Sequence, residues 1–264
     1  MAPSRREVTS GKNPAVQRFR DAADGKLPGL LLAEGPRLVR EALSAGLRVQ
    51  DAAVSPRCTD QDLVRELEQR AATYLACNDE ALARMSALDT PQGVAVLVER
   101  PQADAVALLG GGSAPLVVIA AGVRDPGNLG SILRTAEAAG ATGCITQKGG
   151  ADPFRDKAVR GSMGSIFRLP VRHGLEVAAM LAFVRDHGLQ LVVADGNSRI
   201  AHTQADLRRP TALVMGAEAA GVPAELLAAA DVVVRIPLCE PVESLNVAVA
   251  AGVLLFEAQR QRGG

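Results

Sequence analysis

The sequence predicts an α/β protein in which a mostly parallel sheet forms the larger domain and a smaller α/β domain precedes it. Two patterns support this fold class. Runs of Val, Ile and Leu alternate with helical segments through the second half of the 264-residue chain, as strands do in a parallel sheet covered on both faces. Gly-rich and polar stretches follow these runs directly, at the strand ends where such sheets bind ligands. Hydrophobic residues make up 48% of the chain, enough for a substantial core.

Residues 1–99 are expected to form the first domain, with a basic tail over 1–24 and an alternation of strands and helices after it. One predicted helix, 36–46, begins with Pro and ends with Gly, which is a common helix pattern. A second helix, 60–71, repeats its leucines and valine at helical spacing. The expected strands are 30–33, 49–54, 73–77 and 93–99, and the expected helices are 36–46, 60–71 and 79–88.

A join is expected over residues 100–114, which combine Pro, Ala and a Gly-Gly-Gly-Ser cluster. This composition is typical of a linker. Alternatively, 103–109 forms a short helix tethered by a glycine hinge. Either interpretation separates the first domain from a second domain over residues 115–264.

The second domain repeats the alternation on a larger scale. Its strands are predicted to be continuous apolar runs, because both faces of the sheet are expected to be covered by helices. The expected strands are 116–120, 143–146, 190–194, 212–215 and 232–236, and the expected helices are 129–139, 156–165, 175–187, 223–229 and 244 to about 260.

Composition excludes several classes of protein. The formal net charge is zero and aromatic residues make up only 2% of the chain, so a polyanion must be met by a local basic patch and aromatic stacking platforms are not expected. The four cysteines form no Cys-x-x-Cys pair, which favours a reduced protein without a zinc site or other metal. We find no signal peptide and no run of membrane-spanning length, so a cytoplasmic protein without membrane contact is expected.

The first polar stretch, 125-DPGNLGSILR-134, lies between an apolar run and a small-residue segment. A strand, a Gly-rich turn and a helix start commonly hold a phosphate on backbone N–H groups. However, the stretch lacks the Gly-Lys-Ser/Thr of a nucleoside triphosphate site and the glycine spacing of a dinucleotide site. It places Asn128 in the turn and Arg134 on the helix. As alternatives, Asn128 is a left-handed turn residue and Arg134 is a surface arginine.

Two further stretches follow later strands. In 216-GAEAAGV-222, the glycines suit a strand-to-helix turn, and the simplest interpretation of Glu218 is a solvated side chain. In 236-IPLCEPVESLNVAVAAG-252, Ser244 stands where a helix N-cap belongs. Asn246 lies in the first turn of an otherwise apolar helix, where a polar amide needs a partner from a ligand or a neighbouring chain.

Taken in order, the three stretches resemble the signature motifs of the SpoU (TrmH) family of the SPOUT superfamily, which are RNA ribose 2′-O-methyltransferases that use S-adenosylmethionine. The segment 153-PFRDKAVRGSMGSIFRLPV-171 is similar to the family's segment between the first and second motifs. Segments 10–22 and 32–43 look like the N-terminal, L30e-like substrate-binding domain that many members carry. The resemblance implies a C-terminal trefoil knot, a rare exception to unknotted folds, and a homodimer, which the small residues of the last helix, Ala248, Ala251 and Gly252, would suit.

The resemblance also implies roles for individual residues. Arg134 handles the ribose 2′-hydroxyl, and Asn128 lies at the subunit interface beside the active site. Glu218 and Asn246 hold loops and the arginine in place, while Ser244 caps the helix and touches the substrate side. The residues expected to contact the cofactor are Met215, Gly216, Gly221, Ile236, Leu238 and Leu245.

The third motif departs from the family pattern. Glu240 and Pro241 stand where the family usually has small residues, and Met is commoner than Leu238. We therefore expect a stiffer and more acidic loop with unchanged chemistry. A chain lacking residues 1–100 is expected to remain a folded, cofactor-binding dimer that methylates RNA poorly.

RNA is the expected partner, and ribosomal RNA is favoured over tRNA. Phosphate contacts are predicted for basic clusters near the N-terminus and beside the active-site half; a solvated face is the alternative. The residues are Arg5, Arg6, Lys12, Arg18, Arg20, Arg155, Lys157 and Arg160. A non-catalytic RNA-binding or ribosome-assembly protein with the same fold is the competing function, and it would be favoured had Arg134 or Asn246 been replaced. A nucleotide-dependent oxidoreductase lacks its glycine fingerprint.

Overall fold

The computed structural model describes residues 4–112, 114–217 and 221–263, and the chain divides into two compact units. The first unit consists of Met1–Pro101 with Phe154–Arg168, and the second consists of Gln102–Pro153 with Leu169–Gly264. The chain therefore passes from one unit to the other three times.

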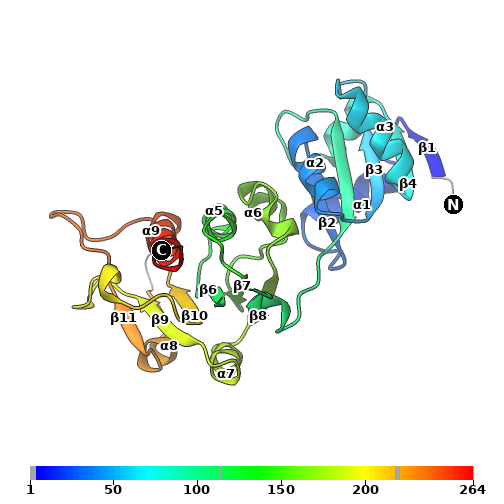
Figure 1. Cartoon of the computed structure of the whole chain (residues 1–264). Coiled ribbons are helices and arrows are strands. Elements are labelled where there is room, and N and C mark those ends of the chain that lie inside the picture. The colour runs from blue at the N-terminus through cyan, green and yellow to red at the C-terminus, as the bar shows by residue number, and fades with distance from the viewer. Residues whose placement is uncertain (1–3, 113, 218–220, 264) are drawn as a thin grey trace. The chain divides into compact units, whose positions relative to one another are not determined.

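The first unit contains a mixed five-stranded sheet in the order β1-β4-β3-β5-β2. β1, β4 and β3 run parallel, and β5 runs antiparallel to β3 and β2. The strands are β1 (Ser4–Val8), β2 (Leu30–Glu34), β3 (Val49–Val54), β4 (Thr73–Cys77) and β5 (Val94–Glu99). The helices that precede or connect them are α1 (Pro14–Ala23), α2 (Pro36–Ser44), α3 (Gln61–Arg70) and α4 (Asp79–Met85) (Figure 1).

Side-chain caps stabilise the first turns of three of these helices, and burial in a hydrophobic core stabilises their packing. Side chains of Asn13, Asp60 and Asn78 accept hydrogen bonds from the first turns of α1, α3 and α4, which satisfies backbone donors that would otherwise lack partners. α1 and α4 share a core cluster with one face of the sheet, with Phe19 and Met85 fully buried.

Residues 4–23, expected to belong to a basic tail, instead form β1 and α1. The arginines of this segment alternate with apolar residues that reach the core. Val8, Val16 and Phe19 are no more than 3% exposed, and the last two are three residues apart on one helix face. The basic composition of the segment concealed this short apolar spacing.

The first unit also includes the segment 154–168, which the sequence placed in the second domain. It forms α6 (Asp156–Gly161) and η2 (Ser165–Phe167), and α6 contacts β2. Arg168 Nη1 lies 2.6 Å from Glu41 Oε2, and the Arg100 guanidinium lies 3.4 Å from the centroid of the Phe154 ring. The side chains of this segment that are at most 6% exposed are Phe154, Ala158, Val159, Ile166 and Phe167.

The second unit contains a six-stranded sheet in the order β11-β9-β10-β6-β7-β8, and every recorded pairing is parallel. The predicted parallel sheet is therefore confirmed. Its strands are β6 (Leu116–Ala120), β7 (Gly143–Gln147), β8 (Val171–Leu175), β9 (Gln190–Ala194), β10 (Thr211–Met215) and β11 (Val232–Val234). β8 was not predicted, because only its first residue is buried and the run is largely polar.

Helices cover both faces of this sheet. α5 (Pro126–Ala138) and α9 (Val247–Arg262) pack together on one face, while α7 (Val177–Asp186) and α8 (Ala224–Ala228) lie on the other (Figure 1). No helix within the described part of the chain has the length and apolar character needed to cross a membrane.

The linker segment is partly packed rather than free. Ala107–Leu109 form the short helix η1, in agreement with the alternative interpretation of residues 103–109. Leu108 is fully buried in the core of the second unit. It lies so close to Gly143 that a Cβ atom there would come within 2.8 Å of Leu108 Cγ, so β7 needs a glycine at its first position.

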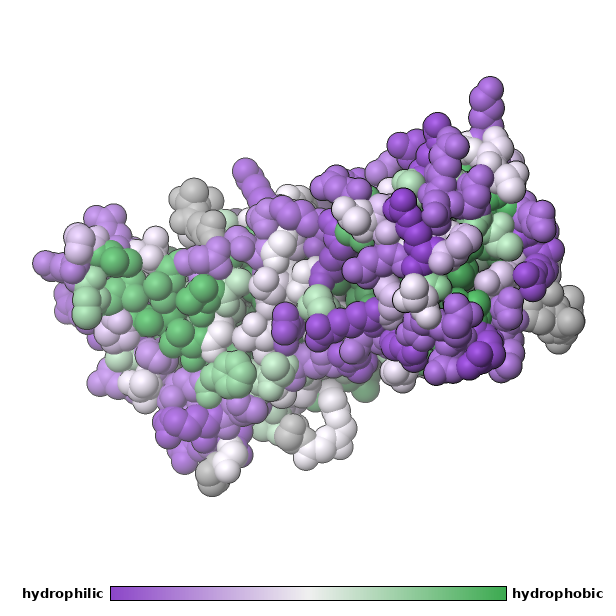
Figure 2. Space-filling view, turned by 90° about the horizontal axis from the view of Figure 1, so that it is seen from above, coloured by the Kyte–Doolittle hydropathy of each residue, from purple (hydrophilic) through white to green (hydrophobic). Residues whose placement is uncertain are grey.

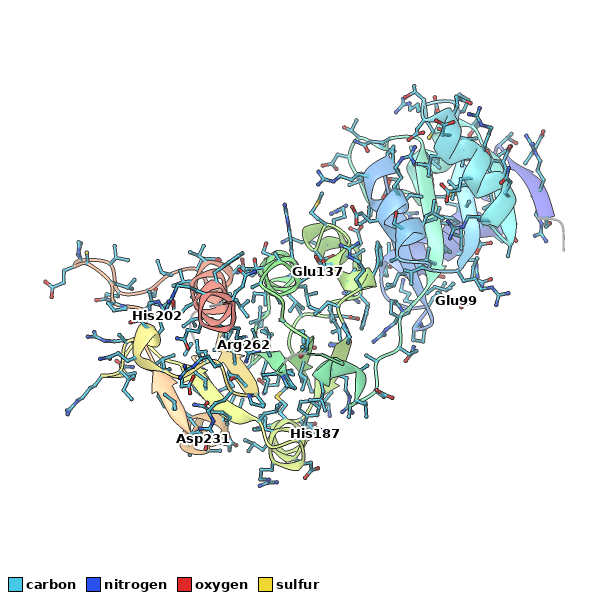
Figure 3. The ribbon with its side chains drawn as sticks, in the orientation of Figure 1. Glu99, Glu137, His187, His202, Asp231 and Arg262 are labelled. Atoms are coloured by element: carbon cyan, nitrogen blue, oxygen red, sulfur yellow. The ribbon has the colours of Figure 1, made fainter. Side chains whose placement is uncertain are left out.

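The last turn of α9 fastens the end of the chain to the second unit. Arg262 Nε donates to Leu207 O at 2.7 Å, and other nitrogens of its guanidinium donate to the backbone oxygens of Ala114, Pro115 and Arg209 (Figure 3). Gln261 Oε1 accepts from Leu207 N at 2.8 Å. These bonds hold the C-terminal turn against the backbone just ahead of β6 and β10.

Candidate active site

A cavity of about 850 Å³ lies at the carboxyl ends of three adjacent strands of the second unit, β9, β10 and β11. This is the edge where open parallel sheets bind ligands. Its described lining consists of Ala194, Asp195, Gly196, Asn197, Met215, Gly216, Ala217, Gly221, Val222, Val234, Arg235, Ile236, Leu238, Glu243, Ser244, Leu245, Val247 and Ala250.

All six residues that we expected to contact the cofactor line this one cavity, although they come from two separate loops. Gly216 is required sterically, because a Cβ atom there would lie 2.6 Å from the carbonyl carbon of Gly221. Gly221 has a φ of +68°, a conformation that favours glycine. Ala217 and Gly221 exchange two backbone hydrogen bonds of 3.0 and 2.9 Å, which fixes both ends of the loop.

Several polar cavity residues were missed. Asp195, Asn197, Arg235 and Glu243 all contribute to the lining. Asp195 Oδ1 accepts from Asn197 N at 2.7 Å, so the carboxylate also shapes its own turn. The signal was present, since Asp-Gly-Asn follows directly on the predicted strand 190–194 and such a triplet marks a turn at a strand end.

The composition of the lining fits S-adenosylmethionine. Met215, Leu238, Leu245 and Val247 provide apolar surface in the cavity wall. Charged residues of both signs, Asp195, Arg235 and Glu243, also line the cavity. A nucleoside carrying a sulfonium, an ammonium and a carboxylate needs both kinds of surface. The volume also lies in the range of roughly 300–1,000 Å³ that is usual for small-molecule sites.

The first and third motifs meet outside this lining, through a pair of asparagines. Asn246 Nδ2 donates to Asn128 Oδ1 at 3.1 Å, which joins the beginning of α9 to the beginning of α5. Asp125 caps α5 by accepting from Asn128 N at 2.8 Å. The amide partner expected for Asn246 is therefore found within the same chain.

One prediction and one alternative interpretation about these residues are wrong. Ser244 is not the N-cap: α9 begins at Val247, and Asn246 Oδ1 accepts from Ala248 N at 2.9 Å and from Val249 N at 3.3 Å. Asparagine caps helices as well as serine does, and a cap at 246 leaves Ser244 in the cavity wall. Asn128 is not a left-handed turn residue, because it lies inside α5.

Arg134 lies on α5 with an exposed side chain and does not line the cavity. Among the residues that the structure describes, none forms a hydrogen bond or an ion pair with its guanidinium. The next residue, Thr135, donates a hydrogen bond from its Oγ1 to Ser131 O at 2.8 Å. The Cγ2 atom of Thr135 faces Gly252 of α9, where a Cβ atom would lie 3.7 Å from it. Glu218 falls outside the described residues.

All eight predicted RNA-contacting residues lie in the first unit. Several are already paired: Arg5 Nη1 lies 3.2 Å from Glu68 Oε1, and Arg18 Nε lies 2.9 Å from Asp51 Oδ2. Arg160 Nη1 lies 3.0 Å from Asp156 Oδ2, and the same nitrogen donates to Ala87 O. Arg160 therefore helps to hold α6 in place. Lys12, Arg20, Arg155 and Lys157 are exposed.

The cysteines differ in burial. Cys58, Cys77 and Cys144 are buried, whereas Cys239 is exposed in the loop between β11 and α9. Burial raises the pKa of Cys77 to about 11 and that of Cys144 to about 12, so both thiols stay protonated at neutral pH. Within the described ranges, no group of three or more His, Cys, Asp and Glu side chains could hold a metal ion.

Comparison with known proteins places this site in a family. The model of the SpoU rRNA methylase family matches residues 115–256, and that of the MRM3-like substrate binding domain matches residues 17–96. An uncharacterised tRNA/rRNA methyltransferase of Synechocystis sp. is 33% identical, covering 97% of this chain and 94% of that protein. The 23S rRNA (guanosine(2553)-2′-O)-methyltransferase RlmP of Bacillus subtilis is 30% identical, covering 95% of this chain and 98% of that protein.

A solved structure agrees with this assignment. The AdoMet-bound rRNA methyltransferase from Sinorhizobium meliloti superposes with a TM-score of 0.86 at 32% identity, covering 97% of this chain and 98% of that chain. The resemblance carried by the three motifs is thereby confirmed along nearly the whole length. The chain belongs to the SpoU rRNA methylase family, the RNA ribose 2′-O-methyltransferases that use S-adenosylmethionine.

Proposed function

We propose that the protein transfers the methyl group of S-adenosylmethionine to a ribose 2′-hydroxyl of ribosomal RNA. The observation that carries this proposal is the cavity at the ends of β9, β10 and β11, which gathers all six expected cofactor residues. Relatives that cover nearly the whole chain support the RNA class, because RlmP of Bacillus subtilis is named for guanosine 2′-O-methylation of 23S rRNA.

The chemistry is an in-line displacement in which the ribose oxygen attacks a methyl carbon. S-adenosylmethionine held in this cavity would supply an electrophilic methyl group, with a neutral thioether as the leaving group. The protein must hold the oxygen in line with that methyl, and it must stabilise the negative charge on the oxygen as the hydroxyl proton passes to solvent water. Backbone and side-chain groups of the cavity wall hold the cofactor, and the proposal requires no metal.

Arg134 is the group that we assign to the 2′-hydroxyl. Its guanidinium stays protonated in proteins and is therefore unsuited to act as a general base. Instead, it orients the ribose and a neighbouring phosphate, and it stabilises the emerging alkoxide through its planar donors. The guanidinium is exposed on α5 and pairs with no described residue, which supports this role because it is available to a substrate.

The asparagine pair acts as a positioning device between the two helices. Asn246 caps α9, and the same residue holds Asn128 at the start of α5. Since Val247 and Ala250 of α9 line the cavity, this bond fixes the helix carrying Arg134 relative to the cofactor wall. Ser244, which lines the cavity, faces the substrate in this proposal, and Glu218 holds the loop that contains it.

The first unit supplies RNA binding, as its match to a substrate-binding domain supports. Exposed basic residues of β1, α1 and the segment 154–168 contact phosphates, because such contacts provide most of the sequence-independent affinity for RNA. Ribosomal RNA is preferred to tRNA, and the proposed location is the cytoplasm.

A homodimer is proposed through α9, but not through its small residues. Ala251 is fully buried, and Gly252 faces Thr135 of α5, so the small-residue face packs within the chain. A different stripe is exposed: Val249, Val253 and Phe256 are 54%, 36% and 48% exposed. Hydrophobic surface gathers over this part of the second unit in Figure 2. Exposed apolar stripes of this kind commonly mark protein interfaces.

The proposal can be tested by labelled methyl transfer. Total RNA from cells lacking the gene is incubated with the protein and methyl-labelled S-adenosylmethionine, and ribose methylation is then mapped by nucleotide. We expect one dominant 2′-O-methyl site in 23S rRNA. In a separate calorimetric measurement, we expect the protein to bind S-adenosylmethionine after a chelator has removed metal ions. Label on a base, or RNA binding without any transfer, would instead favour another reaction or the non-catalytic alternative.

A further inference from the structure

The first unit holds a second cavity, of about 540 Å³, that lies within the sheet-and-helix face formed by β1, α1, β3 and β4. Its base is the apolar core, where Val8, Phe19 and Leu75 are no more than 3% exposed. Its rim is polar and comes from all four elements. The rim residues used below are Arg6, Arg18, Gln50, Asp51 and Thr73.

A β-bulge turns two successive residues of β3 into this cavity. Gln50 and Asp51 both line it, although neighbouring residues of a regular strand point to opposite faces. The register between β3 and β5 shifts between Val49 and Asp51, which makes Gln50 the extra residue. Bulges re-aim side chains and are frequent beside functional sites. Gln50 Nε2 donates to Glu99, labelled in Figure 3, so the Gln50 amide oxygen remains as an acceptor.

One positively charged side chain of the rim forms no ion pair with a described residue. Arg18 and Asp51 neutralise each other at 2.9 Å. Arg6 is exposed, and no described residue receives a hydrogen bond from its side chain. Glu7 also borders the cavity, but strand alternation directs its side chain to the opposite face of the sheet.

We propose that this cavity receives one unpaired nucleotide of the RNA substrate. Arg6 contacts the base plane or its phosphate, while Gln50, Asp51 and Thr73 read the base edge. Proteins recognise RNA sequence mainly in single-stranded segments, where splayed bases stack on aromatic rings or Arg planes and bond through their edges. A base within a duplex has its edge occupied and cannot enter. The inference rests on the proposed function, because it assumes an RNA substrate.

This cavity uses residues ahead of the matched substrate-binding domain. The family match begins at residue 17, whereas β1 and the first turn of α1 contribute Arg6, Val8, Asn13 and Ala15 to the lining. The segment expected to be a basic tail thus builds one wall of the pocket. Its role is specific recognition as well as general attraction to phosphate.

The adjacent arginines of β1 provide a charge-matched test. Arg5 pairs with Tyr74 across the sheet and its guanidinium lies 5.5 Å from that ring, so it points to the face opposite the cavity. The full-length protein is measured by fluorescence anisotropy with a mixed-sequence single-stranded RNA dodecamer and with the corresponding duplex. The readout is the ratio of single-strand to duplex affinity in Arg6→Ala, Arg6→Lys and Arg5→Ala.

We expect Arg6→Ala to lower that ratio by about tenfold, since the unpaired base loses the guanidinium plane on which it stacks. Arg6→Lys should recover little, because an ammonium cannot replace a planar group. Arg5→Ala removes the same charge and should weaken both RNAs alike, leaving the ratio unchanged.

Equal ratios in Arg5→Ala and Arg6→Ala would overturn the inference and leave only a general positive field. Loss of duplex binding equal to loss of single-strand binding in Arg6→Ala would overturn it as well. In either case, methyl transfer by the unmodified protein shows that the proposed function still holds. If the unmodified protein bound neither RNA and transferred no methyl group, the proposed function and this inference would both be lost.

Discussion

Asn246 and Asn128, which lie 118 residues apart in the sequence, share a hydrogen bond of 3.1 Å between the first turns of α9 and α5. Asn246 also caps α9 through its other amide atom. One side chain therefore serves two functions, helix stability and helix placement, and suitable substitutions separate them.

Asn246→Asp should retain the cap but remove the donor of the present bond, because a carboxylate only accepts hydrogen bonds. We expect a change in the free energy of unfolding below about 1 kcal/mol, since Asp and Asn cap helices about equally well, together with slower methyl transfer. Asn246→Ala should cost roughly 0.5–2 kcal/mol through the lost cap. Thermal unfolding and single-turnover transfer measure the two effects, and Asn128→Ala is the variant that removes this bond while leaving the cap of α9 in place. Transfer at the normal rate by the Asp variant would show that the pair has no part in the chemistry.

Arg134→Ala should leave cofactor affinity nearly unchanged, because Arg134 lies outside the cavity lining. Methyl transfer should fall by roughly 10²–10⁴, the range expected for the loss of a positioned electrostatic or proton-transfer group. Arg134→Lys should rescue little, since a point charge does not replace a planar fork. Single-turnover transfer with saturating RNA separates chemistry from binding.

The control for Arg134 is Arg185→Ala, which removes another exposed helix arginine from α7, on the opposite face of the sheet. It should transfer methyl groups at the normal rate. A near-normal rate for Arg134→Ala would make that arginine structural.

Deleting residues 1–100 should not give the folded dimer expected from the sequence. The segment 154–168 belongs to the first unit, so the deletion would expose Phe154, Val159 and Phe167, which are at most 6% exposed. We expect an aggregation-prone chain that exposes apolar surface, measured by light scattering and dye binding. The contrasting variant is Glu41→Gln, which weakens one ion pair to Arg168 and should stay folded. A soluble, monodisperse truncated chain would show that residues 154–168 need no such cover.

The apolar stripe of α9 predicts that Phe256→Asp dissociates the proposed dimer. A charge placed in an apolar interface is desolvated without a partner, so sedimentation should shift toward the monomer. Gln259→Asp, at an exposed position of the same helix, introduces the same charge and should remain dimeric. Equal sedimentation of both variants would place the interface elsewhere.

Acid should weaken the C-terminal turn of α9 through Glu257. Hydrogen bonds from Arg260 lower the pKa of this carboxyl to about 2, below the ordinary value near 4.3. Its contribution to the free energy of unfolding is therefore complete above about pH 4.3 and is lost as the pH falls towards about 2. Between these values, the unfolding temperature of the unmodified protein should fall more steeply than that of Glu257→Gln. Glu225→Gln, at an exposed position on α8, should follow the unmodified protein.

Much of the second unit could be predicted from its apolar runs. β6, β9 and β10 are continuous buried segments, and such runs identify strands of a covered parallel sheet without knowledge of tertiary contacts. Because ligands bind at the ends of such strands, the cavity residues could be predicted together with them. The trefoil knot stays a prediction.

The remaining features depend on packing between distant residues. Nothing in the local pattern of 154–168 indicates that it packs with β2 rather than with the strands on either side of it. The sequence also does not distinguish Ser244 from Asn246 as the N-cap, because both residue types cap helices. Only the structure shows that Asn246 contacts Asn128. β1 was missed because an edge strand with one buried residue gives almost no apolar signal.

The distribution of the cysteines makes the protein ready for site-specific labelling. Three thiols are buried, and Cys239 is exposed in the loop that contributes Leu238 to the cofactor cavity. A maleimide dye added to the native protein at neutral pH would attach next to that wall without any engineered residue. The fluorescence of the attached dye could then follow the loop in real time as cofactor enters and RNA arrives.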